Sequence, residues 1–130
     1  MTQTGFEKLR VYRLSEELSD LAWTVASNWN HLAQNTIGKQ FINAADSIGA
    51  NIAEGTGRGS FADNRRFAKI ARASLFEVKH WVKRAQTRNL LTKNDINRFQ
   101  ELINELAPKL SAYINSIGRI GKNDESKKSF

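Results

Sequence analysis

A glycine-rich segment at residues 47–60, SIGANIAEGTGRGS, is the first place where this sequence could do chemistry. Glycine-rich loops cradle phosphates when a strand precedes them and a Gly-Lys-Ser/Thr sequence enters the next helix. Here apolar residues at helical spacing precede the glycines, and no lysine separates Gly59 from Ser60. We therefore expect the glycines to end one helix and turn the chain into the next. Anion binding beside Arg58, at the start of that next helix, is the alternative.

Glu77 and His80 have the spacing of a metal-binding pair on one helix. In di-iron bundle proteins, Glu-x-x-His motifs on two helices act together with two further glutamates. This sequence has a single Glu-x-x-His motif, so we expect no metal site. It also offers no nucleophile that stands with a base and an orienting partner. The sequence therefore predicts no catalytic residues, no cofactor and no enzymatic activity.

Polar side chains flank the apolar faces of two predicted helices, at residues 36–54 and 60–89. Two glutamates among them could act as a catalytic carboxylate pair. Buried polar groups more commonly satisfy one another and fix the register of packed helices. We favour this second interpretation and assign these residues to a structural polar network: Ser47, Asn51, Glu54, Ser74 and Glu77.

Positive charge is concentrated in one part of the chain. The 130 residues carry a net charge of +7 and a pI near 10.0. Residues 58–89 hold nine Lys and Arg against two Asp and Glu, and elsewhere basic and acidic residues balance. At about 100° per residue, one arc of this helix carries Phe76 and what we call the basic stripe: Arg65, Lys69, Arg72, Lys79 and Lys83.

A basic stripe around an aromatic ring can follow a phosphate backbone while the ring stacks on a base. The alternative is a solvated helix face, with Phe76 packed on a neighbouring protomer. We favour nucleic-acid binding and assign it to the stripe and its surroundings: Arg58, Arg65, Arg66, Lys69, Arg72, Phe76, Lys79, Lys83 and Arg84.

Helices must position these residues. Apolar residues recur at helical spacing over four segments, at about 14–32, 36–54, 60–89 and 92–117. Ser60 and Thr92 stand where N-caps are expected, each with an aspartate three residues later. The pattern predicts an all-α fold, an antiparallel up-and-down four-helix bundle over residues 1–118. Residues 119–130 are predicted to be a polar, disordered tail.

The apolar faces of the four segments are expected to form one core, and spacing places Leu32 and Ile70 on these faces. Tyr12 and Trp23 lie on the opposite side of the first segment, away from that core. Large aromatic side chains in such a position are typical of interfaces. The sequence therefore predicts a homo-oligomer with Tyr12 and Trp23 at the protomer boundary.

Composition bounds the environment of the protein. The chain contains no cysteine, which suits a reducing compartment. No run approaches the roughly 18 apolar residues of a membrane span, and the N-terminus lacks a signal pattern. We expect a cytoplasmic protein with no membrane partner.

Several short motifs occur together in this sequence: NIAEG at residues 51–55, FEKLRVY at residues 6–12, SI at residues 47–48, IA at residues 70–71 and SL at residues 74–75, with Arg58, Phe67 and Glu77. Together they resemble a known family, the 23S rRNA intervening-sequence proteins, which are four-helix-bundle proteins. Trp23 stands where the family usually has tyrosine, and Ala73 where it usually has glycine before the serine.

The resemblance implies a four-helix bundle that assembles as a ring-like homopentamer. It also implies kinship with the accessory variability determinant protein of diversity-generating retroelements, which is basic and binds a reverse transcriptase and nucleic acid. From the residues and the resemblance we predict a non-enzymatic, oligomeric bundle that binds structured RNA. The alternative is a protein–protein scaffold, such as an accessory subunit of a reverse transcriptase.

Overall fold

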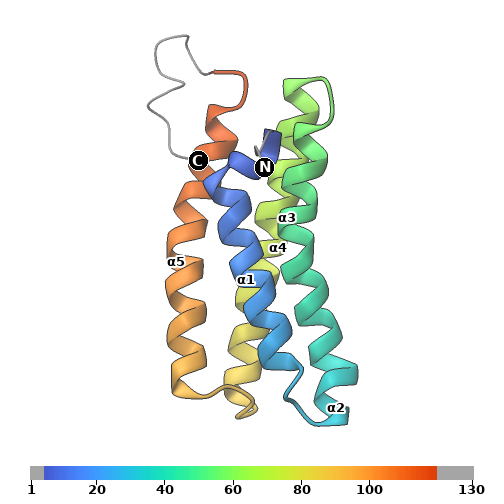
Figure 1. Cartoon of the computed structure of the whole chain (residues 1–130), viewed down its shortest axis with the longest axis vertical. Helices are drawn as coiled ribbons and strands as arrows, with labels where there is room; N and C mark the ends of the chain where they lie inside the picture. Colours follow the sequence, from blue (N-terminus) through green and yellow to red (C-terminus); the bar gives the residue numbers. More distant parts are fainter. Residues whose placement is uncertain (1–4, 120–130) are drawn as a thin grey trace.

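The computed structural model describes residues 5–119, which form helices joined by short links (Figure 1). A 3₁₀ turn, η1 (Gly5–Lys8), leads into the first long helix, α1 (Arg10–Ala26). After a link come the short helix α2 (His31–Ala33) and a π-helical turn, η2 (Gln34–Gly38).

Three further long helices follow. α3 (Lys39–Thr56) continues directly from η2, and α4 (Phe61–Thr87) and α5 (Lys93–Ser116) come after it. No strand occurs within residues 5–119, so the predicted all-α fold with four long helices is confirmed. Of the predicted tail at 119–130, all but Arg119 lies outside the described residues.

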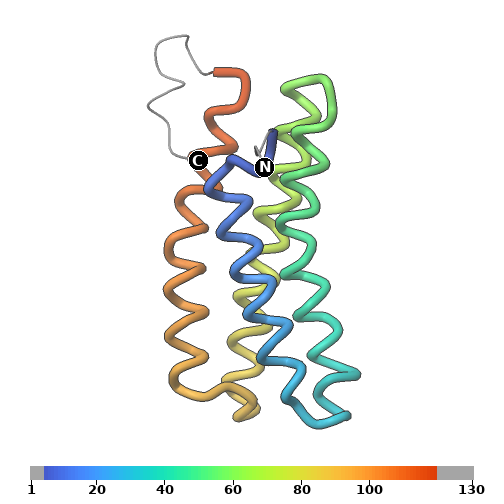
Figure 2. Tube along the Cα trace, in the orientation of Figure 1, coloured from blue at the N-terminus to red at the C-terminus, as the bar shows by residue number. Residues whose placement is uncertain are grey.

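The four long helices lie side by side, and the chain path in Figure 2 crosses the length of the molecule with each of them. α1 contacts α3 and α5, and α4 also contacts α3 and α5. The core between them contains three neighbouring aromatic rings: Phe41 stacks on Trp29 with centroids 6.0 Å apart and packs at a tilt of 59° against Phe99 with centroids 5.3 Å apart. Aliphatic side chains such as Leu14 and Ile52 fill the rest and are fully buried. Each helix thus buries its apolar face against the others.

Side chains at the N-termini of α4 and α5 cap these helices as predicted. The Ser60 hydroxyl accepts a hydrogen bond from the Asp63 amide at 3.1 Å. The Thr92 hydroxyl accepts from the Asp95 amide, and the Asp95 carboxylate accepts from the Thr92 amide, both at 3.0 Å. The reciprocal pair is a capping box that satisfies two otherwise free N–H groups.

The predicted extent of the first helix is wrong, because α1 ends at Ala26 and does not reach Leu32. Ser27 and Asn28 donate side-chain hydrogen bonds to carbonyl groups at the end of α1, at 2.6 and 3.0 Å. Such local bonds compete with helix continuation. Trp29 then turns inward, while Leu32 lies on α2 and is 76% exposed.

The placement of Ile70 in the core is also wrong, since 39% of its surface is exposed. The buried face of α4 runs instead through Ala68, Ala71, Leu75 and Val78. Two of these residues are alanines, which let α4 lie close to its neighbours. The buried arc is therefore rotated about the axis of α4, toward Ala68 and Leu75, relative to the arc that the spacing of apolar residues predicted. None of the helices of residues 5–119 has both the length and the apolarity to cross a membrane.

Gly55 marks a close approach between the end of α3 and the start of α4. A Cβ atom at this position would lie 2.6 Å from Asn64 Oδ1 and 3.0 Å from Phe67 Cβ. Both distances are shorter than packed atoms tolerate, so the glycine of the NIAEG segment allows the two helices to meet.

We expect Gly55→Ala to lower the free energy of unfolding by about 1–3 kcal/mol, because the added methyl group must displace Asn64 or Phe67. Urea unfolding followed by circular dichroism measures this. Gly57→Ala is the matched control: its φ is −84° and its nearest neighbour would be 3.6 Å away. That change should be neutral or stabilise by about 0.4–1 kcal/mol. Equal effects of the two changes would contradict the close approach.

Candidate nucleic-acid interface

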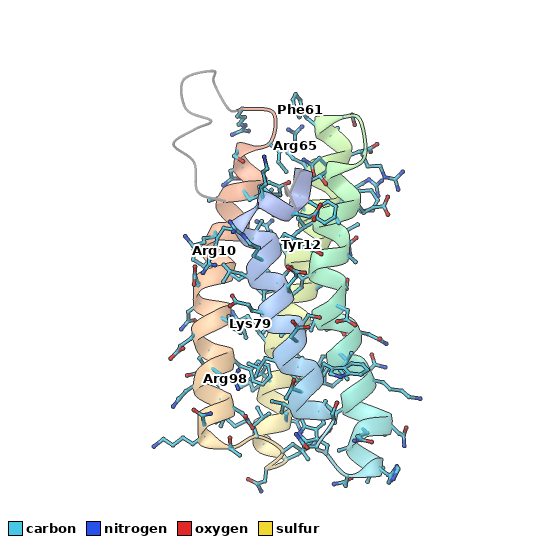
Figure 3. All side chains as sticks on the ribbon, viewed as in Figure 1. Arg10, Tyr12, Phe61, Arg65, Lys79 and Arg98 are labelled. Carbon is cyan, nitrogen blue, oxygen red and sulfur yellow. The ribbon has the colours of Figure 1, made fainter. Side chains whose placement is uncertain are left out.

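The basic stripe lies along α4, on the part of the helix that borders α5. Its residues and Phe76 follow one another at intervals of three or four positions, which keeps them on one face. Lys69, Lys79 and Lys83 are exposed, and Arg72 is half-buried. Arg65 is half-buried at one end of the stripe, where its Nη1 donates to the Ile117 carbonyl at 2.8 Å. Figure 3 shows Arg65 beside Phe61, close to the end of α5.

The cations of the stripe have no carboxylate partner among residues 5–119. Ion pairs within that range involve other basic residues: Arg10 with Glu105, Arg58 with Glu54, and Arg66 with Asp63. Neighbouring positive charges on one face repel one another unless counterions or a ligand neutralise them. The stripe is therefore a surface that favours a polyanion.

Phe76 lies in the middle of the stripe and is 59% exposed. The Lys79 ammonium sits 5.5 Å from the centroid of its ring. An exposed aromatic ring beside an ammonium group offers a stacking surface for a base and a charge for the adjoining phosphate. Both residues were predicted to bind nucleic acid, and in the structure they lie side by side.

Arg58 and Arg66 were assigned to the same interface, but the structure gives them different contacts. Their guanidinium groups lie 4.7 and 4.5 Å from the centroid of the Phe67 ring, near the turn between α3 and α4. Arg58 also pairs with Glu54 at 3.1 Å, and Arg66 with Asp63 at 3.7 Å. These two cations are thus partly neutralised at the turn, away from the middle of the stripe. Arg84, the remaining assigned residue, is half-buried near the other end of α4.

The start of α4 is a poor site for a bound anion. The Ser60 hydroxyl already accepts a hydrogen bond from the Asp63 amide, and the Asp63 carboxylate lies in the first turn of α4. A negative side chain at a helix N-terminus interacts with the same N–H groups that an anion would use. The glycine-rich segment therefore ends α3 and turns the chain, as the first interpretation predicted.

Three of the five residues assigned to a polar network come together between α3 and α4. The Ser47 and Ser74 hydroxyls are 2.7 Å apart, and Asn51 Nδ2 donates to the Ser47 carbonyl at 2.8 Å and to its hydroxyl at 3.1 Å. Ser74 is buried and the other two are half-buried. The Ser47–Ser74 bond links the two helices, and the Asn51 bonds hold the Ser47 end of that link within α3.

Glu54 and Glu77 do not join this network. Both are exposed: Glu54 pairs with Arg58, and the Glu77 carboxylate accepts a hydrogen bond from Trp81 Nε1 at 3.0 Å. Their long side chains reach outward from helix positions beside the network. The structure thus forms no carboxylate pair here, and residues 5–119 contain no cluster of three or more His, Cys, Asp or Glu side chains that could hold a metal ion.

Tyr12 and Trp23, the predicted interface residues, lie in different surroundings. Trp23 is 62% exposed on α1. Tyr12 is half-buried, packs edge-on against Phe6 with ring centroids 4.8 Å apart, and lies over Gly49 of α3. The prediction that Tyr12 points away from the bundle is therefore wrong. Burial, together with the negative charge of Glu16 and a hydrogen bond to it, raises the pKa of the Tyr12 hydroxyl.

A groove between α4 and α5 brings polar residues beside the stripe that the sequence had not indicated. Lys79 and Lys83 of the stripe form one wall, and Gln100 and Asn104 of α5 line the other side. The two amides are four residues apart, so they share a helix face. That spacing was visible in the sequence, but their position opposite the stripe depends on how α5 packs against α4.

Comparison with known proteins assigns the chain to a family. The model of the family described as 23S rRNA-intervening sequence protein matches residues 7–112 of the 130. The match covers most of the chain, so the chain belongs to this family. A comparison with curated proteins finds no match.

We expect Ser74→Ala to lower the free energy of unfolding by about 1 kcal/mol, because the half-buried Ser47 hydroxyl loses its partner on the other helix. Thermal or urea unfolding measures the change. Ser19→Ala is the control, since Ser19 also donates to a neighbouring helix, to Asp46, but near the surface. Water can replace that partner, so the control should cost less. A larger loss for Ser19→Ala than for Ser74→Ala would contradict a structural role for the network.

Proposed function

We propose that this member of the 23S rRNA-intervening sequence protein family binds structured RNA through the basic stripe of α4, as a homo-oligomer and without catalysing a reaction. The observation that carries the proposal is the stripe itself: cations follow one face of α4 without a carboxylate partner among residues 5–119. Binding a phosphate backbone would relieve their repulsion and release counterions.

The dimensions of the stripe suit a nucleic-acid backbone. From Arg65 to Lys83 the helix rises about 27 Å, at about 1.5 Å per residue. This length can follow several successive phosphates. Because charge rather than base contacts would supply most of the affinity, binding should depend on salt far more than on sequence.

Assembly would strengthen such contacts. We propose that the helices form an antiparallel up-and-down bundle, which the chain path in Figure 2 supports, and that copies of it form a ring, pentameric by resemblance. Repeated stripes would then bind one RNA at several points, so weak single contacts would add up. Trp23 is proposed to lie at the protomer boundary. We also propose that the protein acts in the cytoplasm, where RNA is accessible and where a chain without cysteine suits the reducing conditions.

A protein partner is the second candidate. Exposed apolar side chains outside the stripe favour it: Phe61, beside Arg65 at the start of α4, is 65% exposed, and Leu32 of α2 is 76% exposed. A scaffold or an accessory subunit of a reverse transcriptase could use such residues as anchors. Reversing charges on the stripe would leave that kind of binding intact and abolish RNA binding.

We expect Lys69→Glu with Lys79→Glu to weaken binding to every RNA tested and to flatten the dependence of affinity on salt. The slope of log affinity against log salt should fall by about 0.7–0.9 for each phosphate that the variant no longer neutralises. Anisotropy titrations at several salt concentrations measure this. Both lysines are exposed, so the fold should survive the change.

Lys39→Glu with Arg98→Glu is the matched control for the stripe. This variant changes the net charge by the same amount as the stripe variant. Lys39 lies on α3, and Arg98 lies on the side of α5 that borders α1. The control should retain most of the affinity and the full salt slope. Absence of RNA binding by the wild-type oligomer at low salt would defeat the proposal and leave the protein scaffold.

We expect Trp23→Ala to shift the protein toward smaller species, because a mostly exposed aromatic side chain on α1 is a typical interface anchor. Light scattering at micromolar concentration measures the mass. Leu32→Ala removes a comparably exposed apolar side chain from α2 and should leave the assembly intact. A wild-type monomer at this concentration would reject the oligomer, and an unchanged Trp23→Ala assembly would reject Trp23 as its anchor.

A further inference from the structure

The groove between α4 and α5 has a volume of about 460 Å³, within the range of small-ligand sites. Lys79, Lys83 and Gln86 of α4 line it at intervals of four and three residues, so they form one continuous wall. Gln100 and Asn104 of α5 line the other side. The groove is open to solvent along one side of the bundle.

The lining of the groove combines three kinds of chemistry. The two lysines supply positive charge, and neither has a carboxylate partner among residues 5–119. The amides of Gln86, Gln100 and Asn104 supply donors and acceptors. The side chains of Val82 and Ile103 also line the groove and add an apolar surface.

The two glutamates of α5 lie toward its other side, and Asp95 caps its N-terminus. Glu105 pairs with Arg10 of α1 at 2.9 Å, and Glu101 lines a separate groove between α1 and α5 together with Arg98. Figure 3 shows Arg10 and Arg98 along that α1–α5 side of the molecule. No carboxylate lines the α4–α5 groove within the described residues 5–119. Its charge is therefore complementary to a phosphate group.

We propose that this groove receives an unpaired nucleotide of bound RNA, with its phosphate on Lys79 and Lys83 and the edge of its base on Gln100 and Asn104. The proposal rests on the RNA-binding function inferred above, and it adds a site that distinguishes bases. Amide side chains pair with adenine through its N6 and N7 atoms, so we expect a preference for adenine. Val82 and Ile103 would contact the face of the base.

Continuity with the stripe supports this assignment. Phe76 lies one turn of α4 before Lys79, and its ring contacts the Lys79 ammonium. A strand that follows the stripe would therefore bring one base near Phe76 and the next nucleotide toward the groove. Sequence-specific proteins that bind RNA commonly read unpaired bases in this way, by stacking one side and hydrogen-bonding the edge.

The test compares short, labelled homopolymers of A, U and C of equal length, titrated with the full-length protein. We expect wild type to bind the A homopolymer more tightly than the others by roughly tenfold, the scale of one bidentate contact to a base. Gln100→Ala with Asn104→Ala should remove that preference without changing the salt slope, because both side chains are uncharged. Circular dichroism checks that the variant folds.

Gln40→Ala with Asn43→Ala is the matched control, since it removes the same two amides from exposed positions on α3. The control should keep the preference. If wild type binds all three homopolymers equally and with full salt dependence, the groove does not read bases, while RNA binding by the stripe stands. A preference that survives Gln100→Ala with Asn104→Ala, or an equal loss of affinity for all three homopolymers, would also overturn the site. Absence of binding at low salt would overturn both proposals.

Discussion

The close packing of α3 on α4 is the constraint on which the remaining surface depends. Gly55 allows the helices to meet at one end, and Ser47 and Ser74 bond across the interface further along. Small side chains at these points let the two backbones approach closely. The larger side chains around them then interdigitate, and this packing fixes the rotation of each helix about its own axis. Turning α4 would carry Lys79 or Arg72 toward the core, where an unpaired charge is very costly. The position of the cationic face is thus a result of how the core packs.

The two sides of α5 have different electrostatic characters because of this arrangement. On the side facing α1, Arg10 and Glu105 neutralise each other. On the side facing α4, amides stand opposite lysines. A helix with its side chains is roughly 10–12 Å across, and charges in physiological salt are screened over about 8 Å. The carboxylates of α5 therefore do little to reduce the positive potential on its other side.

Features that depend on local sequence were predictable, and those that depend on neighbouring helices were not. The caps at Ser60 and Thr92 and the extents of α4 and α5 follow from short-range patterns, and they agree with the structure. Leu32 was wrongly placed on the core face of the first helix because the spacing of apolar residues does not reveal the side-chain hydrogen bonds that compete with helix continuation at the end of α1.

Other misplacements arose from side-chain reach and helix register. Helical spacing placed Glu54 and Glu77 beside the core, but it could not show that both carboxylates extend outward to other partners. Gln100 and Asn104 were missed because their relation to the stripe exists only once α5 is packed against α4 in one register. The lysines and arginines of the candidate site could therefore be predicted from the sequence, whereas the position of the Gln100 and Asn104 amides beside them could not.

The bond from Trp29 Nε1 to the Leu90 carbonyl, at 2.8 Å, joins two links that are 61 residues apart in the chain. One link follows α1 and the other connects α4 to α5. Because they share this partly buried contact, a local opening that frees one link also removes a hydrogen-bond partner from the other, so we expect the two links to open together. The stability of the α4–α5 turn is in this way coupled to a tryptophan in a distant part of the chain.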